Sequence, residues 1–359
     1  MFGIEAIVSD ELKRLSMRDV RAENGRVLFS GNERDLARAN INLATGERVL
    51  IIVGETPAKT FDELFEGVKR MPWEDLIPID GAFPVKGHSL NSSLHSIPDC
   101  QSIIKKATVE RLRAKYNVNW FNETGSRYQI QFSIMRDVAT LYLDTSGAGL
   151  HKRGYRPVSS AAPLRETLAA AIVRLSRYRG RDTVYDPFCG SGTLPIEAAL
   201  AAVNRAPGVD REFAAQKWVR LPESIWSEAR SEARDREYHG KYDIHGGDID
   251  PKCIELSVNN AERAGVSEHI RFSAADAARF SKVSESGLMI TNPPYGERVM
   301  LPYDVQKLYR DFGSAVLGLD LKMYILSAHT EFESSFGKKA VKKRKLYNGM
   351  IKCDLYMYY

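Results

Sequence analysis

The sequence has 359 residues, of which 43% are hydrophobic and 27% are charged, and its formal net charge is +5. Its length favours two domains over one, and its apolar content is enough for a sizeable core. It has no run of the roughly 20 apolar residues that a membrane span needs, and acidic residues near its start argue against a signal peptide, so we expect a cytoplasmic protein without membrane contact. The mild positive charge is compatible with a polyanionic partner but identifies none.

The spacing of cysteine and histidine argues against bound metal. The four cysteines are scattered without a C-x-x-C pair, which favours free thiols over a disulfide framework or a zinc site. His88 and His95 lie near Cys100 in the sequence, but we interpret them as unrelated loop residues. We therefore expect no metal site.

The first 150 residues predict helices and strands in irregular alternation, which is typical of an α+β region. The clearest element is a long helix over residues 96–116, with Ser96 as its cap and Pro98 in its first turn. Two strands with a period of two flank Arg136-Asp137 and predict a hairpin. The other expected segments are helices over 3–15 and 60–71 and extended chain over 25–31 and 81–90.

After residue 150, strands and helices alternate strictly, which is the signature of βαβ units around a parallel sheet. This half is therefore of the α/β class. At its end, two strands surround Asn348-Gly349 and predict an antiparallel hairpin. The candidate strands are residues 182–186, 242–248, 269–276, 287–292 and 322–328, and the candidate helices are 162–176, 193–203, 251–265 and 303–317.

The first of these strands runs into a glycine-rich turn, "PFCGSGT", at residues 187–193. Gly190 and Gly192 would let a ligand approach the backbone at the carboxyl edge of the sheet, where open α/β sheets bind ligands. A dinucleotide fingerprint would need a third glycine where Pro195 stands, and the lysine of a phosphate loop is also missing. Because Asp186 ends the strand with an acceptor, the turn suits a cationic ligand better than a pyrophosphate.

Acidic residues also end the next two strands. Asp248 stands where a ribose diol would be bound, with Asp250 at the start of the following helix. Asp276 ends the third strand and could accept a hydrogen bond from an adenine amine. Each residue alone is equally well explained as a cap or turn residue, but three successive strands that end in acids favour a nucleoside site.

The fourth strand ends in Asn-Pro-Pro-Tyr at residues 292–295. The side-chain oxygen of Asn292 and the carbonyl of Pro293 can both accept hydrogen bonds from one planar NH₂ group, while Tyr295 supplies a ring on which its base stacks. An exocyclic base nitrogen is a poor nucleophile because its lone pair is delocalised. Two acceptors on its hydrogens would stabilise the positive charge that develops as a methyl group arrives. We interpret this segment as an amine site rather than a simple turn.

These segments, "DPFCGSGT", "GGDID", "SAAD" and "TNPPYGERV", resemble those of class I S-adenosylmethionine-dependent amino-methyltransferases. More narrowly, "LHKRGYRPVSSAAPLRETLAAAIV" and "KLYNGMI" are similar to the THUMP-domain RNA guanine-N2 methyltransferases of the YpsC and RlmL type. The resemblance covers essentially the whole chain. It implies S-adenosylmethionine as cofactor and large-subunit (23S) ribosomal RNA as substrate.

The resemblance also implies the domain order: a ferredoxin-like part over residues 1–50, a THUMP RNA-binding domain over 51–150, and a Rossmann-like methyltransferase domain with a mostly parallel seven-stranded sheet over 151–359. Family members usually carry an apolar strand before the "FGIEA" segment, whereas this sequence begins at Met1-Phe2. We therefore expect either that this edge strand is missing or that the start is truncated. A monomer is slightly preferred over an oligomer.

The family's site residues can be carried over one by one. Cys189 is interpreted as a small residue that fits the turn and not as a nucleophile, because no base is spaced to activate it. The resemblance assigns cofactor binding to Asp186, Cys189, Gly190, Ser191, Gly192, Thr193, Asp248, Asp250 and Asp276, and it assigns catalysis at the target amine to Asn292, Pro293, Pro294 and Tyr295.

RNA contacts are expected from a cationic segment between the two halves, where both phosphate neutralisation and base stacking would be needed. The run Lys342 to Lys345 is explained equally well by a strand and by RNA contact. The four tryptophans are expected in the core. The RNA-binding candidates are His151, Lys152, Arg153, Tyr155 and Arg156.

Two other functions remain open. The Asn-Pro-Pro-Tyr segment also serves adenine-N6 methylation of nucleic acids and glutamine methylation of proteins, and the preference for guanine follows from the family resemblance alone. A protein of another class, a non-catalytic RNA-binding assembly factor, would have a decayed site, and the intact acids and Asn292 argue against it.

Overall fold

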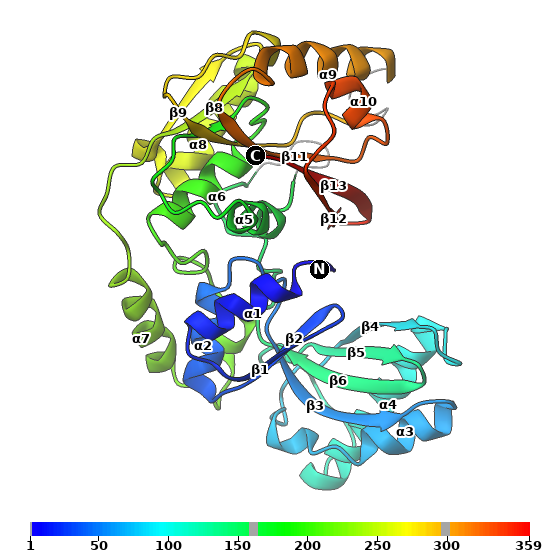
Figure 1. Cartoon of the computed structure of the whole chain (residues 1–359). Coiled ribbons are helices and arrows are strands. Elements are labelled where there is room, and N and C mark those ends of the chain that lie inside the picture. The colour runs from blue at the N-terminus through cyan, green and yellow to red at the C-terminus, as the bar shows by residue number, and fades with distance from the viewer. Residues whose placement is uncertain (1, 158–163, 296–301) are drawn as a thin grey trace.

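The computed structural model describes residues 2–157, 164–295 and 302–359. Two quoted motifs therefore lie partly outside the described residues: positions 158–163 of the segment after Leu150, and positions 296–299 of "TNPPYGERV". Figure 1 shows two lobes: an upper one that carries most of the chain after residue 150, and a lower one that carries the N-terminal half. No described helix is both long enough and apolar enough to cross a membrane.

The N-terminal part packs two helices beside a small sheet. Asn32 caps its second helix by accepting from the Asp35 N–H at 3.0 Å, and the Asp35 carboxylate accepts from the Asn32 N–H in return. The elements are α1 (Glu5–Arg14), β1 (Arg18–Glu23), β2 (Arg26–Ser30) and α2 (Glu33–Asn42), and β1 and β2 pair antiparallel.

The rest of the lower lobe is a four-stranded sheet in the order β3-β6-β5-β4, covered by helices α3 and α4. The predicted hairpin is confirmed, with Arg136 and Asp137 in its turn at φ of +52° and +63°. The long helix is also confirmed, but Ser96 makes no side-chain cap bond. The elements are β3 (Leu50–Pro57), α3 (Phe61–Lys69), η1 (Trp73–Asp75), β4 (Val85–Leu90), α4 (Ile97–Tyr116), β5 (Ile130–Met135) and β6 (Val138–Asp144).

The upper lobe is built on a seven-stranded sheet in the order β12-β13-β11-β10-β7-β8-β9, which confirms the expected α/β class. Strands β7 to β11 run parallel, and the terminal hairpin β12–β13 adds antiparallel to β11. The strands are β7 (Val184–Asp186), β8 (Ile244–Asp248), β9 (Ile270–Ala274), β10 (Gly287–Thr291), β11 (Leu321–Ser327), β12 (Lys342–Asn348) and β13 (Ile351–Tyr358).

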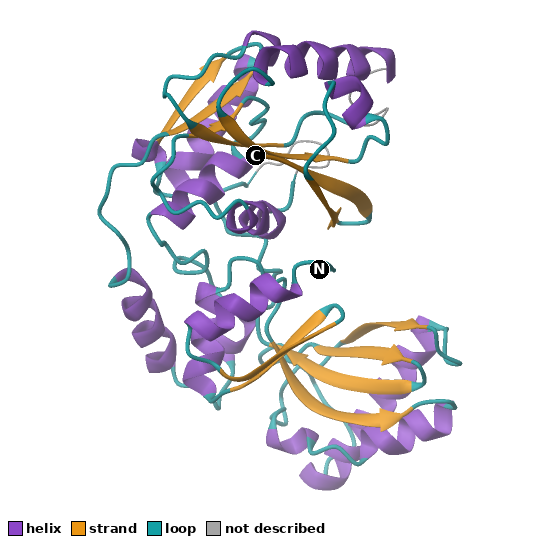
Figure 2. Cartoon of the chain, in the orientation of Figure 1, coloured by secondary structure: helices purple, strands orange, loops and turns teal. Residues whose placement is uncertain are grey.

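Helices cover both faces of this sheet (Figure 2). One apolar cluster lies between the sheet and α5, α6 and α8, and another lies between the opposite face and α9 and α10. The helices are α5 (Glu166–Leu175), α6 (Thr193–Ala202), α8 (Pro251–Arg263), η3 (Ser267–His269), η4 (Ala277–Arg279), α9 (Pro302–Val316) and α10 (Phe332–Phe336).

An excursion between α6 and β8 returns to the lower lobe. It carries η2 (Ala214–Lys217) and α7 (Glu223–Arg234), and α7 lies beside α2 in Figure 1. The Arg38 guanidinium on α2 donates to both oxygens of Glu232 on α7, at 3.0 to 3.2 Å. Phe213 and Trp226 are buried in the same apolar core as the N-terminal helices and the four-stranded sheet. The excursion therefore joins the two lobes.

Candidate active site

The candidate site lies along the carboxyl ends of four neighbouring parallel strands. Because the sheet order is β10-β7-β8-β9, the strand ends place Asn292, Asp186 and Asp248 side by side, with Asp276 two residues beyond β9. Direct bonds tie these ends together: the Thr291 hydroxyl donates to Asp186 at 2.6 Å. The sheet thus assembles in one row the residues that the sequence separates by up to 106 positions.

The glycine turn between β7 and α6 leaves room for a ligand. Gly190 and Gly192 both have positive φ, +52° and +81°, which favours glycine. A Cβ atom added at Gly190 would meet no atom within 4 Å, so the backbone is open to a close approach there. The Cys189 N–H donates to the Gly247 carbonyl at 2.8 Å, which fixes the turn against β8.

Asp248 is positioned by two backbone donors. Its carboxylate accepts from the Gly190 N–H and from the Asp250 N–H, each at 3.0 Å. Each carboxylate oxygen keeps a free lone pair, as binding of a ribose diol would require. Ile249, next in the chain, is 75% exposed, so an apolar side chain lies uncovered beside this acid. This exposed residue was not predicted, although an isoleucine between two aspartates was a signal in the sequence that could have indicated it.

Asp186 is an acid that burial keeps partly neutral. It is 2% exposed, and burial raises its pKa to about 7, against the opposing effect of hydrogen bonds from Thr291 and from the Phe188 N–H. A nearby cation would favour its ionised form. This arrangement suits the predicted cationic ligand.

The two remaining acids have local roles in the backbone. Asp250 caps α8 by accepting from the Lys252 N–H at 2.9 Å, and Asp276 caps η4 by accepting from the Ala278 N–H at 2.9 Å. For Asp276, this capping bond engages one oxygen. Both bonds agree with the simpler explanation from the sequence, that these residues are helix caps.

Two side chains on α8 that support the glycine turn were not predicted from the sequence. The Ser257 hydroxyl donates to the Gly190 carbonyl at 2.7 Å, and the Asn260 amide donates to the Ser191 carbonyl at 2.9 Å. Both side chains are fully buried. Their spacing of three residues on an otherwise apolar helix face was the available signal, because a buried polar side chain needs a partner.

The end of β10 holds an acceptor without a donor. The side-chain oxygen of Asn292 is buried, and no hydrogen-bond partner for it is found among the described residues. The Pro294 carbonyl, in contrast, accepts from the Tyr309 hydroxyl at 2.8 Å. A buried, unpaired acceptor costs roughly 1–3 kcal/mol, which a ligand that donates there would relieve.

Tyr295 is tied to the terminal hairpin. Its ring packs against the apolar cluster under the sheet, and its hydroxyl lies 3.7 Å from the Cys353 sulfur on β13. Burial raises the pKa of this tyrosine above its usual range, so it stays neutral at physiological pH. Cys189 has a pKa raised by burial as well, which agrees with its interpretation as a small structural residue.

The expected RNA contact is wrong for Arg153 and Tyr155, because both are buried in a network within the protein. The Arg153 guanidinium donates to Glu197 at 3.3 Å, with the two side chains 3% and 2% exposed. The Tyr155 hydroxyl donates to the same carboxylate at 3.2 Å. Arg153 also donates to the Leu150 carbonyl at 2.7 Å, so its charge is compensated internally.

Arg156 is likewise turned inward, which contradicts its assignment to RNA. It pairs with Glu166 at 2.9 Å, with both side chains nearly buried, and it donates to the Thr193 hydroxyl of the glycine turn at 2.9 Å. It therefore supports the turn. His151 is half-buried beside Glu47, and Lys152 is exposed. RNA contact by these last two residues stays a prediction.

Comparisons with known proteins place this geometry in a family. Three family models match the chain: the RlmL ferredoxin-like domain over residues 1–50, the THUMP domain over 58–144, and the RMKL-like methyltransferase domain over 153–357. The chain is 43% identical to the "Putative RNA methyltransferase YpsC" of Bacillus subtilis (strain 168), over 99% of this chain and 94% of that protein.

Two further relatives extend the comparison. The chain is 35% identical to the ribosomal RNA large subunit methyltransferase K/L of Psychromonas ingrahamii over 99% of its own length, and it spans about half the length of that protein, 49%. The solved structure of SMU.472 in complex with SAH is 41% identical and superposes with a TM-score of 0.93, over 100% of this chain and 96% of that chain. The chain therefore belongs to the THUMP-domain family of S-adenosylmethionine-dependent methyltransferases with an RMKL-like catalytic domain.

Proposed function

We propose that this protein transfers a methyl group from S-adenosylmethionine to the exocyclic N2 amine of a guanine in RNA, with large-subunit ribosomal RNA as the substrate and the cytoplasm as its place of action. The observation that carries the proposal is the buried oxygen of Asn292, which lies beside the glycine turn and has no hydrogen-bond partner among the described residues. The THUMP domain match and the similarity to the K/L methyltransferase support RNA as the polymer.

The residues at the carboxyl edge fit the cofactor. The open backbone at Gly190 allows a close approach, Asp248 offers acceptors for the ribose hydroxyls, and exposed Ile249 offers an apolar surface for the adenine. Asp186 and the neighbouring turn suit the positively charged end of the molecule. When bound, S-adenosylmethionine supplies an electrophilic methyl group on a sulfonium.

The chain's own residues orient the nucleophile. The Asn292 oxygen and the Pro293 carbonyl accept from the two hydrogens of the target amine, and Tyr295 stacks against the base. The Pro294 carbonyl is already engaged by Tyr309, which fixes the segment. The N–C bond forms as the S–C bond breaks, S-adenosylhomocysteine leaves, and the surplus proton of the methylated amine passes to solvent.

The test is nucleoside mass spectrometry after methyl transfer in vitro. Ribosomal and transfer RNA from cells that lack the gene are incubated with purified protein and isotopically labelled S-adenosylmethionine, and the nucleosides are separated. We expect label in N2-methylguanosine of the large ribosomal RNA. Label in methyladenosine would keep the amine mechanism and overturn the guanine assignment.

Absence of label from every RNA would overturn the proposal. DNA and protein glutamine would then be tested as acceptors with the same labelled cofactor, and lack of transfer to either would leave a non-catalytic RNA-binding factor. The Asn292→Ala variant serves as the matched control in each reaction, because it removes the acceptor and leaves the glycine turn in place.

A further inference from the structure

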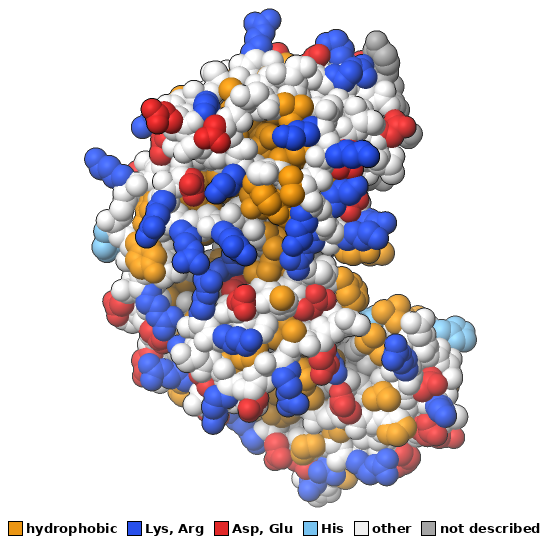
Figure 3. All heavy atoms as spheres, in the orientation of Figure 1, with side chains coloured by type: hydrophobic (Ala, Val, Ile, Leu, Met, Phe, Trp, Pro, Cys, Tyr) orange, Lys and Arg blue, Asp and Glu red, His pale blue; other side chains and the backbone are white. Residues whose placement is uncertain are grey.

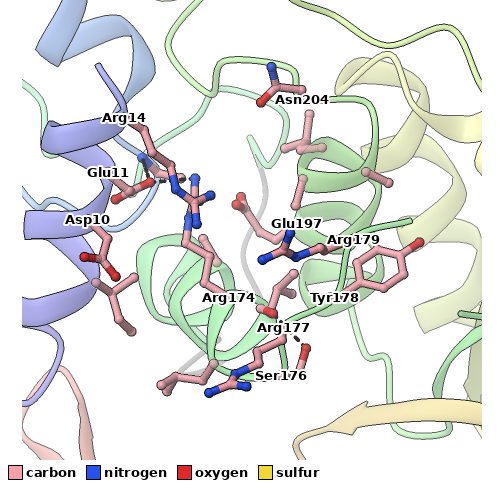
Figure 4. A pocket seen from close by; sticks show the side chains of 18 of the residues that line it. Asp10, Glu11, Arg14, Arg174, Ser176, Arg177, Tyr178, Arg179, Glu197 and Asn204 are labelled. Atoms are coloured by element: carbon pink, nitrogen blue, oxygen red, sulfur yellow. Dashed lines mark hydrogen bonds and ion pairs between the residues drawn. The ribbon is translucent and has the colours of Figure 1, made fainter. Parts of the chain in front are cut away.

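A cavity lies at the end of the sheet opposite the candidate active site. It has a volume of about 1330 Å³ and lies between α1 of the N-terminal part and the end of α5 (Figure 4). Asp182, which precedes β7, and Lys322, near the start of β11, line it, so it opens at the amino ends of the parallel strands. Pockets for drug-sized ligands measure roughly 300–1,000 Å³. This cleft, which we call the amino-edge cleft, has room for part of a polymer.

The lining of the amino-edge cleft is strongly cationic. Nine Lys and Arg side chains and four Asp and Glu side chains line it, an excess of five positive charges. The formal net charge of the whole 359-residue chain is also +5. Figure 3 shows Lys and Arg side chains gathered on the middle of the visible face, over α5 and α1. The charged residues outside the cleft lining therefore sum to a net charge of zero, whereas the lining itself carries the excess.

Five of these cations are exposed and have no side-chain partner in the part of the chain that the structure describes. Arg174 pairs with Glu11 across the cleft at 2.7 Å, so part of the charge is compensated. Within the described ranges, no side-chain hydrogen bond or ion pair is found for the others named here. They are Arg14, Arg177, Arg179, Lys322 and Lys342. Like charges gathered without counter-ions repel one another, and a bound polyanion would relieve that repulsion.

The turn after α5 is built to present two of these arginines. Tyr178 is 8% exposed and anchors the turn, while Arg177 and Arg179 on either side of it are exposed. Arg177 adopts a φ of +60°, which is uncommon for a residue other than glycine. Figure 4 shows both arginines on the α5 side of the cavity, with Arg14 on the α1 side. A planar guanidinium matches the geometry of a phosphate group.

Aromatic rings accompany the charges. Tyr238 and Tyr359 line the same cleft, and each is 61% exposed. Exposed rings among phosphate-binding cations are typical of surfaces that bind unpaired nucleotides, because every base has a face that can stack.

We propose that the amino-edge cleft binds the phosphodiester backbone of the RNA at a distance from the methylated nucleotide. The inference rests on the proposed function in that RNA is the substrate. The cleft and the candidate active site lie at opposite ends of the parallel strands, so one RNA molecule would contact the upper lobe at two ends.

The test compares two triple variants that remove the same charge. Arg177→Ala/Arg179→Ala/Lys322→Ala removes three cleft cations, and Arg310→Ala/Lys338→Ala/Lys339→Ala removes three exposed cations beside α9 and α10, on the other face of the sheet. Fluorescence anisotropy measures binding of a labelled single-stranded RNA of about 20 nucleotides over a range of KCl concentrations. Each neutralised phosphate of a single strand contributes about 0.7 to the salt slope.

We expect the cleft variant to lower the salt slope by about 2 and to weaken binding at least about tenfold, while the control variant keeps both values. Calorimetric binding of S-adenosylhomocysteine, unchanged in both variants, shows that each is folded. A cleft variant that binds RNA with the wild-type slope and affinity would overturn the inference, and so would wild-type protein that does not bind the RNA at all.

A footprint on the wild-type protein gives an independent readout. Lysine acetylation followed by mass spectrometry is expected to show RNA protection of Lys322 and Lys342 and none of Lys338 or Lys339, and equal reactivity with and without RNA would contradict the cleft. The outcomes separate the two proposals. If RNA binding depends on the cleft but the wild-type protein transfers no methyl group, only the proposed function is rejected. If the cleft variant binds RNA normally and still transfers the methyl group, only the proposal about the cleft is rejected.

Discussion

The carboxyl and amino ends of the parallel sheet differ in how their polar side chains are partnered. At the carboxyl end, Asp186 and Asp248 accept hydrogen bonds from within the protein, and the oxygen of Asn292 is left over. At the amino end, exposed cations such as Arg177 and Arg179 have no partner within the described residues. The hydrogen bonds at the carboxyl end hold the acidic side chains in defined positions. The cations at the amino end are concentrated in one place, but no partner holds their side chains.

Charged side chains therefore have two different roles in this protein, and the amino-acid composition alone does not distinguish them. A partnered charge contributes to the stability of the fold, and its removal leaves a buried partner behind. An unpartnered, exposed charge contributes little to stability and acts on a ligand at longer range. Mutations can therefore test the comparison, because the two classes should respond in different measurements.

The largest effect is expected where a partnered cation is removed. Arg153→Met leaves the Glu197 carboxylate buried without its counter-ion, and we expect a loss of about 3–5 kcal/mol in the free energy of unfolding, measured by urea denaturation. Arg177→Ala, the matched loss of an unpartnered arginine, is expected to change stability by less than about 0.5 kcal/mol. If both variants lost the same stability, the distinction between partnered and unpartnered charges would fail.

The next largest effect, on the rate of methyl transfer, is expected at the side-chain oxygen of Asn292. Asn292→Ala is expected to lower kcat about 100- to 1000-fold, because one of two groups that stabilise charge on the amine is removed. Binding of S-adenosylhomocysteine and of RNA should stay at the wild-type level, as measured by calorimetry and anisotropy. A variant with normal kcat would show that this oxygen has no part in the reaction.

A smaller effect is expected from the titration of Asp186. Its pKa in the free protein is about 7, above the ordinary value of 3.8, so the fold favours the protonated form and this residue's contribution to stability falls as pH rises from about 4 to 7. An ammonium group near Asp186 favours its ionised form, and S-adenosylhomocysteine keeps the ammonium of the cofactor although it lacks the sulfonium. We therefore expect the affinity for S-adenosylhomocysteine to rise about tenfold between pH 6 and pH 8 by calorimetry. Asp186→Asn should abolish that rise in affinity. If the variant kept the same pH profile, the rise would come from the titration of a group other than Asp186.

The smallest effect is expected from the hydroxyl of one tyrosine. Tyr309→Phe removes the donor to the Pro294 carbonyl and the contact of the same hydroxyl with the Ser327 hydroxyl at 3.3 Å, and the loss of stability should be about 1 kcal/mol. Thermal unfolding measures this change. A loss of stability several times larger would mean that the hydroxyl of Tyr309 supports more of the structure than the segment after β10.

The sequence was sufficient to predict which residues meet at the carboxyl edge of the sheet, because its signals are local. Each of Asp186, Asp248 and Asn292 directly follows or ends an apolar strand, and parallel strands bring their carboxyl ends together whatever the rest of the chain does. The strands of the upper lobe and helices α5, α6, α8 and α9 were predicted for the same reason, whereas α10 was not. The hairpins at Arg136-Asp137 and Asn348-Gly349 also depend on adjacent residues alone.

The errors arose where a role depends on distant partners. Arg153 looked like a surface cation because Glu197, which neutralises it, lies 44 residues further along the chain. Trp120 was expected in the core and is 80% exposed, whereas Trp73, Trp218 and Trp226 are buried as expected. The amino-edge cleft draws its lining from α1, the turn after α5 and the starts of β11 and β12, which no local pattern connects.

The excursion that carries α7 has a consequence for the modularity of the chain. Its residues leave the upper lobe after α6, bury Phe213 and Trp226 in the core of the lower lobe, and return to form β8. A fragment cut near residue 150 would expose these rings, and the N-terminal piece would lose part of its own core. The backbone thus links the two lobes at more than one crossing, and separating them near residue 150 would leave both lobes incomplete.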